Sequence, residues 1–124
     1  MTTALLAMAG SVFADPSLEC STQSSSQVET GQCLEVIETR VDAALEIALR
    51  FAQDSARELD QVTERDSAVP ALEASQNAWE TYRSNHCDYR GALFGGGSGT
   101  GIEIRSCRIE LTRARTEELM ELLP

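Results

Sequence analysis

Apolar residues recur at steps of three and four through the middle of the chain, and this spacing predicts one long amphipathic helix. The stripe begins at Leu34, after Gly31, and ends before Asp66. Its apolar positions are Leu34, Ile37, Val41, Ala44, Ala48, Phe51, Ala52, Ala56, Leu59 and Val62. Residues 15–31 are rich in Ser, Thr, Gln and Gly, so we expect an irregular arm there, with room for a short helical turn after Ser26.

Two shorter helices are predicted in the second half. One begins near Val69, because Pro70 is tolerated in a first helical turn. Its expected inward stripe is Leu72, Gln76, Trp79, Tyr82, His86 and Tyr89. The other runs from about Glu103 to Leu122, and its expected inward residues are Ile104, Cys107, Leu111, Ala114, Leu119 and Leu122. The predicted fold class is all-α: a small, disulfide-stapled antiparallel bundle of one long and two shorter helices.

The two shorter helices are separated by residues 95–101, which hold five glycines in seven positions. This composition ends a helix and predicts a flexible connector. A phosphate-binding loop is the alternative, but no strand precedes the segment and no Lys follows it.

The N-terminus is typical of a targeting segment. Residues 1–14 carry no charged side chain, and their apolar run leads to a small residue, Ala14, which predicts a cleaved signal peptide even though no Lys or Arg precedes the run. The alternatives are a disordered apolar tail or a core helix, since about ten apolar residues are too few to span a bilayer. The residues before Cys20 do not form a lipoprotein box. We therefore expect residues 15–124 to be one periplasmic or secreted domain without a membrane anchor.

Four cysteines, at positions 20, 33, 87 and 107, predict two disulfides in an exported domain of this size. Of the three possible pairings we favour Cys20 with Cys33 and Cys87 with Cys107, because each closes a short loop between segments that lie close together in a helical hairpin. A metal site is the alternative, but no cysteine pair has Cys-x-x-Cys spacing, and the only histidine, His86, adjoins Cys87. We expect no metal ion and no cofactor.

Charge narrows the choice of partner. Twenty acidic against ten basic residues give a formal net charge of -10, which argues against nucleic acid or an anionic membrane and favours a cationic protein. Residues 15–66 hold 12 of the acidic residues and 4 of the arginines. Glu38, Asp42 and Glu46, on the polar face of the long helix, are candidates for attracting that partner. A charge run is also typical of a face that is only solvated.

The second half carries an ordered set of residues: Leu72, Gln76, Trp79, Tyr82-Arg83 and Cys87, then Gly96-Gly97-Ser98, then Cys107, Leu111-Thr112, Arg115 and Leu119. This set resembles the LprI-type lysozyme inhibitor family of small exported bacterial domains, and Cys20, Cys33 and the long helix agree with it. The resemblance covers nearly all of residues 15–124 and implies lysozyme binding, although inhibition is attached to only some members. The inhibitor that names the family is a lipoprotein, whereas this chain lacks a lipoprotein box.

The residues that carry the resemblance also have structural interpretations. Trp79 and Tyr82 are expected to anchor the core of the helix pair. A polar network that fixes the helix register is expected to include Gln76, Arg83, Thr112 and Arg115, with one of the two arginines pairing a carboxylate of the long helix. Direct contact with a ligand is the alternative role for these four residues.

Three classes of function follow from these features. The first is an envelope protein that binds and inhibits cationic lysozyme-type muramidases, with Gly96, Gly97 and Ser98 offering a hydroxyl and backbone donors to the carboxylates of the enzyme cleft. The second is a non-inhibitory periplasmic interaction or stress-related module with another protein partner. The third, an enzyme, is disfavoured because the chain has one histidine and no evident pair of nucleophile and base. The sequence does not determine the oligomeric state.

Overall fold

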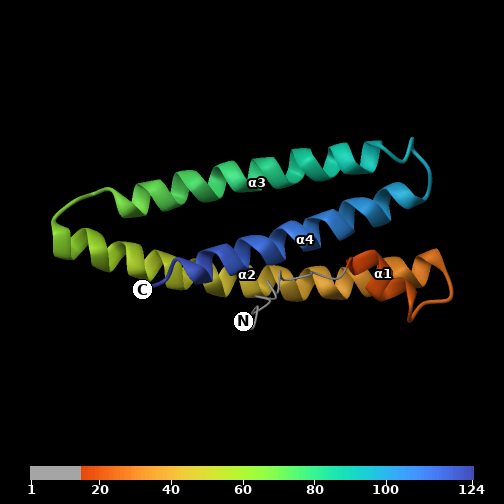
Figure 1. The fold of residues 1–124 in the computed structure, drawn as a ribbon, viewed down its shortest axis with the longest axis horizontal. Coiled ribbons are helices and arrows are strands. Elements are labelled where there is room, and N and C mark those ends of the chain that lie inside the picture. The colour runs from red at the N-terminus through yellow and green to blue at the C-terminus, as the bar shows by residue number, and fades with distance from the viewer. Residues whose placement is uncertain (1–14) are drawn as a thin grey trace, which may run out of the picture.

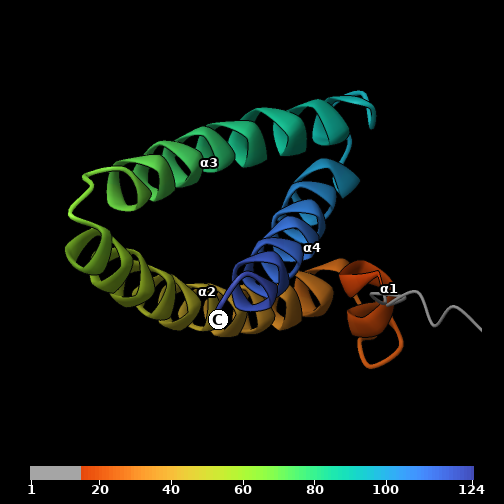
Figure 2. The same ribbon diagram turned by 60° about the vertical axis from the view of Figure 1, so that its left-hand side comes forward.

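The computed structural model describes residues 15–124, so the predicted signal peptide lies outside the described residues. This part of the chain contains no strand and four helices: α1 (Pro16–Ser21), α2 (Gln27–Thr63), α3 (Ala68–Ala92) and α4 (Gly99–Glu121). A short turn joins α2 to the antiparallel α3, and α4 runs back from the far end of α3 onto α2, with α1 packed beside both (Figures 1 and 2). The predicted all-α antiparallel bundle is confirmed.

The long helix begins earlier than its apolar stripe. The Ser26 hydroxyl accepts a hydrogen bond from the Glu29 amide at 3.2 Å, and the Glu29 carboxylate accepts one from the Ser25 amide at 2.8 Å. This reciprocal arrangement is close to a capping box, and it satisfies amides that a helix start leaves free. Gly31 therefore lies inside α2. The predicted irregular arm over residues 15–31 was therefore wrong for most of its length: residues 16–21 form α1 and residues 27–31 begin α2, so only residue 15 and the link of residues 22–26 lie outside these helices. The helical turn expected after Ser26 is the start of α2.

Two disulfides hold the helices together in the pairing favoured from the sequence. Cys20 bonds Cys33 and ties α1 to α2, with a Cα–Cα distance of 5.8 Å. Cys87 bonds Cys107 and ties α3 to α4, with a Cα–Cα distance of 5.5 Å. The same two helices approach closely at Gly91, where an added Cβ would lie 2.5 Å from the Ile104 side chain. A larger residue at this position would force the Ile104 side chain, or the two helices, to shift.

The core consists of two apolar clusters along α2. Near its start, Leu34 and Val41 pack with Ile109 of α4 and with the disulfide sulfur of Cys20. Farther along, a second cluster contains Leu45, Ala48 and Leu119, with Leu49, Ala52, Leu72 and Trp79 packed against it. Among residues 15–124, no helix has the length and apolar composition that crossing a membrane would require.

Several predicted inward positions are in fact exposed. On α2, the predicted Ala44 is exposed and its neighbour Leu45 is buried instead, while Phe51, Leu59 and Val62 are exposed. On α4 the predicted stripe was wrong at Ala114 and Leu122, which are exposed, and it missed the buried residues Ser106, Ile109, Thr112 and Arg115. The reason is that α4 contacts α1, α2 and α3, so its buried side chains do not share one stripe.

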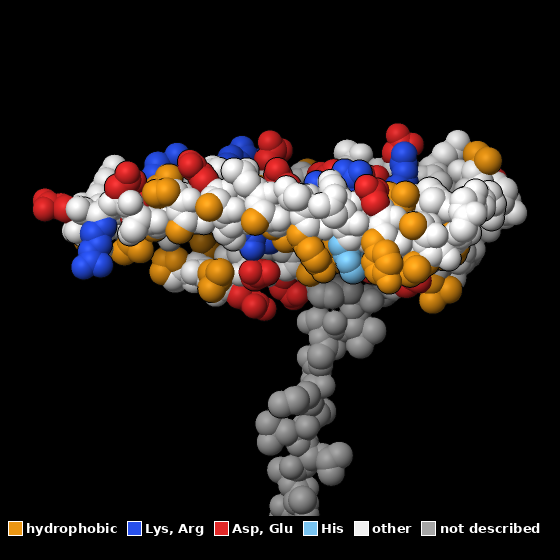
Figure 3. Space-filling model, turned by 90° about the horizontal axis from the view of Figure 1, so that it is seen from above, with side chains coloured by type: hydrophobic (Ala, Val, Ile, Leu, Met, Phe, Trp, Pro, Cys, Tyr) orange, Lys and Arg blue, Asp and Glu red, His pale blue; other side chains and the backbone are white. Residues whose placement is uncertain are grey.

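The stripe predicted for α3 mixes two faces of the helix. Tyr82 and Tyr89 are 53% and 61% exposed, so the prediction of Tyr82 as a core anchor was wrong. Their rings flank His86, with ring centroids 5.2 Å and 6.4 Å from it. Figure 3 shows hydrophobic side chains on both sides of the histidine on this outer face. Trp79, by contrast, is half-buried and packs against the second core cluster.

This difference between two neighbouring aromatic residues predicts unequal effects on stability. Trp79→Ala should lower the free energy of unfolding by about 2 kcal/mol, because it removes a ring packed on the core. Tyr82→Ala should change it by less than about 0.5 kcal/mol, because the Tyr82 ring is mostly in water. Urea unfolding followed by circular dichroism measures both values. Equal losses would show that Tyr82 also supports the core.

The turn between α2 and α3 is organised by one carboxylate. Asp60 of α2 accepts hydrogen bonds from the amides of Ala68 at 2.8 Å, Val69 at 3.0 Å and Ser67 at 3.4 Å. These are free amides at the start of α3, and Ser67 itself makes no side-chain cap. The amides of Val69 and Ala68 lower the pKa of Asp60 below its ordinary value, since they stabilise the charged form. Asp60 thus joins the two helices across the turn.

The lowered pKa of Asp60 predicts a pH-dependent contribution to stability. Stabilisation is complete above the pKa of the unfolded state, about 4, and is lost as the pH falls through the lower pKa of the folded state. Asp60→Asn should therefore lower the melting temperature at pH 7 and make that temperature less sensitive to acid than it is in the wild type. Asp54→Asn is the control, because Asp54 lies on the same helix and bonds only exposed Arg57. Identical acid profiles for wild type and Asp60→Asn would contradict the role of Asp60.

Candidate functional site

The glycine-rich segment lies between α3 and α4, at the end of the bundle opposite the α2–α3 turn (Figure 1). Gly95 and Gly96 have φ values of 66° and 84°, a conformation that glycine adopts without strain. Residues 99–101 belong to α4, so the prediction of a connector over all of residues 95–101 was too long. Gly96, Gly97 and Ser98 are exposed. Ser98 lines a shallow hollow with Gln27, Val28 and Gly31 of α2, so this residue lies against the start of the long helix.

The three acidic residues singled out on the long helix have different surroundings. Glu38 faces α4, where its carboxylate lies 3.9 Å from Arg105 and 3.6 Å from Arg108. The Asp42 carboxylate lies 3.7 Å from Arg83 of α3. Glu46 forms no ion pair with the described residues and is exposed. Of these three carboxylates, Glu46 is the one without an ion pair among the described residues, while Glu38, whose side chain is 21% exposed, is flanked by two arginines of α4.

The polar residues of the second half link α3 to α4 in two places. Arg83 donates a hydrogen bond to the Thr112 hydroxyl at 3.0 Å, and its guanidinium lies 4.8 Å from the centre of the Trp79 ring. Arg115, which is 5% exposed, donates to Gln76 Oε1 at 3.1 Å. The expected ion pair with the long helix is made by Arg83, through Asp42. Arg115 instead pairs with Glu118 of its own helix at 3.2 Å.

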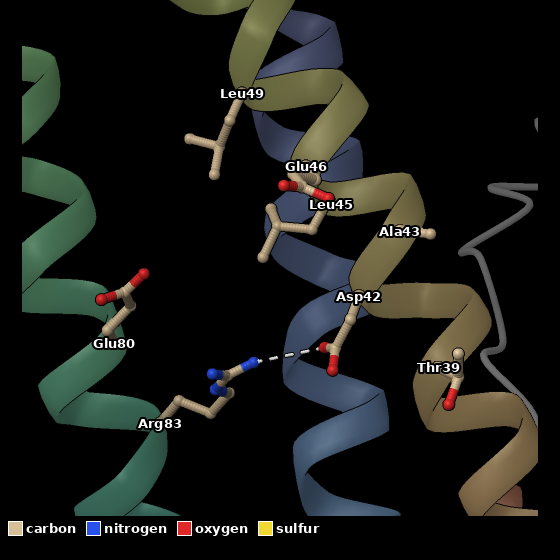
Figure 4. A pocket seen from close by; sticks show the side chains of 8 residues that line it. All are labelled: Thr39, Asp42, Ala43, Leu45, Glu46, Leu49, Glu80 and Arg83. Atoms are coloured by element: carbon tan, nitrogen blue, oxygen red, sulfur yellow. Dashed lines mark ion pairs between the residues drawn. The ribbon is translucent and has the colours of Figure 1, made fainter.

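A groove runs between α2 and α3 beside these polar links. Two adjoining hollows of about 480 Å³ and 390 Å³ share Leu49 and Glu80 and together form what we call the α2–α3 groove. It is lined by Thr39, Asp42, Ala43, Leu45, Glu46, Leu49 and Gln53 of α2 and by Leu72, Glu73, Gln76, Asn77, Glu80 and Arg83 of α3. In Figure 4, Glu46 and Glu80 extend from opposite walls, and Arg83 reaches across to Asp42.

The groove includes two carboxylates that the sequence interpretation missed, Glu73 and Glu80. They lie three residues before and four residues after Gln76, so all three residues share one face of α3. That spacing is readable in the sequence, but it does not say which neighbouring helix the face meets. Among residues 15–124, no group of three His, Cys, Asp or Glu side chains is arranged to hold a metal ion.

Residues 19–119 match the model of a protein family described as Lysozyme inhibitor LprI. A protein of Rhizobium meliloti (strain 1021), named Uncharacterized protein R02472, is 43% identical to this chain over 56 residues. That similarity spans 45% of this chain and 40% of the relative, so less than half of either protein is covered. No solved structure matches the chain.

Proposed function

This chain belongs to the lysozyme inhibitor LprI family, and on that premise we propose that it binds and inhibits lysozyme-type muramidases of net positive charge. The family match, which extends from residue 19 to residue 119 and so includes all four cysteines, carries the proposal. The net charge of -10 supports it, because opposite charge accelerates association with a basic enzyme and makes the rate sensitive to salt.

The site of action that we propose is the periplasm or the space outside the cell. Two disulfides close loops with sequence separations of 13 and 20 residues, and such bonds persist in an oxidising compartment. Muramidases also act there on the cell wall. The glycine-rich connector between α3 and α4 is the element proposed to block the enzyme cleft, since Gly96, Gly97 and Ser98 are exposed. The amides of Gly96 and Ser98 and the Ser98 hydroxyl are the donors that it offers, because the Gly97 amide already donates to the Phe94 carbonyl.

Inhibition is tested by cell-wall lysis. Oxidised protein of residues 15–124, which holds all four helices, is titrated against a cationic lysozyme, with an unrelated protein of equal net charge as the control. Inhibition beyond that control is the expected result. Lack of inhibition across several types of lysozyme would contradict the proposal and favour a non-inhibitory interaction module with another protein partner.

The connector is tested in the same assay by adding one charge. Ser98→Glu should weaken inhibition by at least about tenfold, because a new carboxylate would meet the catalytic carboxylates of the cleft. Ser84→Glu is the matched control: it adds the same charge on exposed α3, away from the connector. If both variants inhibit like the wild type, the connector does not enter the cleft.

A further inference from the structure

The α2–α3 groove combines an apolar floor with acidic walls. Leu45, Leu49 and Leu72 lie among its lining residues, and they belong to the second core cluster or pack against it. Around them stand four carboxylates, from Asp42, Glu46, Glu73 and Glu80. A floor of this kind suits the methylene stem of a long side chain, while the carboxylates suit a cationic head.

Most of the negative charge in the groove is uncompensated. Arg83 is the one basic side chain in the lining, and it is already bonded to Thr112 and paired with Asp42. The other three carboxylates form no ion pair with any residue from 15 to 124. The groove therefore presents three free carboxylates around its apolar floor.

A second feature is Gln76, a lining residue of the groove whose side chain carries a hydrogen-bond donor without an acceptor. Gln76 is 8% exposed, and its Oε1 accepts from Arg115 Nε. Because an arginine side chain only donates, this bond fixes the orientation of the amide and leaves Nε2 as the free donor. The buried Nε2 atom has no hydrogen-bond partner. A buried donor without a partner is costly, so an acceptor at this point would stabilise the protein.

These two features call for different chemistry in one ligand. The carboxylates need a cation, whereas the Gln76 donor needs an oxygen acceptor. A metal ion or a polyamine supplies charge but no acceptor. A basic peptide segment supplies both, because each arginine or lysine residue carries a main-chain carbonyl beside its cationic side chain.

We propose that the α2–α3 groove is a docking site for a basic segment of the partner protein. The cationic side chain lies over the leucine floor with its head between Glu46 and Glu80. A main-chain carbonyl accepts from Gln76 Nε2, which is buried in the free protein and is uncovered by a small shift of the Gln76 side chain on binding. The identity of that partner as a cationic muramidase rests on the proposed function, whereas the affinity of the groove for a basic peptide does not. The groove adds specificity to the general attraction of the negative surface.

Charge-matched variants separate the groove from the overall charge. Glu46→Gln with Glu80→Gln removes two carboxylates from the groove, and Glu58→Gln with Glu121→Gln removes two exposed carboxylates outside it. Affinity for a cationic lysozyme is measured by calorimetry at about 0.15 M salt. The groove variant should bind at least about tenfold more weakly than the control variant, which should stay within about twofold of the wild type. Equal affinities of the two variants would overturn the proposal that the groove is a docking site, while leaving the proposed inhibitor function standing.

A small probe tests the groove without any enzyme. The peptide acetyl-Gly-Arg-Gly-amide, at millimolar concentration, is added to ¹⁵N-labelled protein, with spermidine as the probe that lacks a carbonyl. Shifts of the Gln76 side-chain amide and of the Glu46 and Glu80 backbone amides with the peptide, and no shift of the Gln76 side chain with spermidine, would support the groove. They would do so even if no lysozyme bound. No shift of these signals with the peptide, or equal shifts of the Gln76 side chain with both probes, would overturn it.

Discussion

Replacement of Arg115 by Met is expected to lower the free energy of unfolding by about 3 kcal/mol. Arg115 is 5% exposed and donates to Gln76 Oε1 at 3.1 Å and to the Ser75 hydroxyl at 3.0 Å. Met keeps most of the stem and removes the guanidinium, so the amide of Gln76 loses its bond to α4. The loss therefore measures mainly the polar link between α3 and α4, because most of the side-chain stem is kept. Urea unfolding followed by circular dichroism gives the value.

Arg113→Met is the matched control for this link. Arg113 lies on the same helix, and its guanidinium is 3.6 Å from the partly exposed carboxylate of Glu19. Ion pairs in such surroundings contribute about 1 kcal/mol or less. If Arg113→Met and Arg115→Met destabilise the protein equally, the hydrogen bonds of Arg115 to α3 do not hold the bundle together.

Removal of the Cys87–Cys107 disulfide is also expected to lower the free energy of unfolding by about 3 kcal/mol. The bond joins α3 to α4 across a sequence separation of 20 residues, close to the connector between these helices. Without it, the unfolded chain gains conformational entropy and the folded chain loses its covalent link at the open end of the bundle. Ala is the replacement at both positions, because each cysteine is almost fully buried and a serine hydroxyl would lack a partner.

The second disulfide provides the comparison. Cys20→Ala with Cys33→Ala opens a shorter loop, with a sequence separation of 13 residues, and loosens only the short α1 from α2. The loop-entropy model predicts a slightly smaller loss in the free energy of unfolding for the Cys20–Cys33 pair. Urea unfolding under oxidising conditions measures both pairs. A loss below about 1 kcal/mol for the Cys87–Cys107 pair would contradict its role in holding α3 against α4.

Local patterns in the sequence were sufficient for the kind of fold. The helical spacing of apolar residues, the Pro70 start signal and the glycine-rich break each depend on residues within one or two turns, so they predicted three of the four helices. The start of α2 was also readable in the sequence, because Ser26 and Glu29 have the spacing of a capping box. Disulfide pairing followed from loop length.

The orientation of each helix was not readable in the same way. Periodicity groups the residues of one helix into faces, but it does not say which neighbour a face meets. Tyr82 and Trp79 share a predicted stripe, and yet Trp79 packs on the core while Tyr82 lies in water. Arg115 and Thr112 were expected in a polar network, but helical periodicity did not place them on the inward stripe of α4, and the structure buries both because α4 packs against three helices.

For the candidate site, too, some features were determined by the sequence and others only by the tertiary structure. The sequence by itself determined the net charge of -10, the helical class, the four cysteines and the acidic residues of the long helix. Only the tertiary structure decided that Glu38 is paired with arginines of α4 and that Glu80 faces Glu46 across the groove. It also decided that Gln76, whose buried amide donor has no acceptor, belongs to the same lining. The reason is physical: charge and helical period belong to the residues and their near neighbours, whereas a groove exists only where two helices distant in sequence come together.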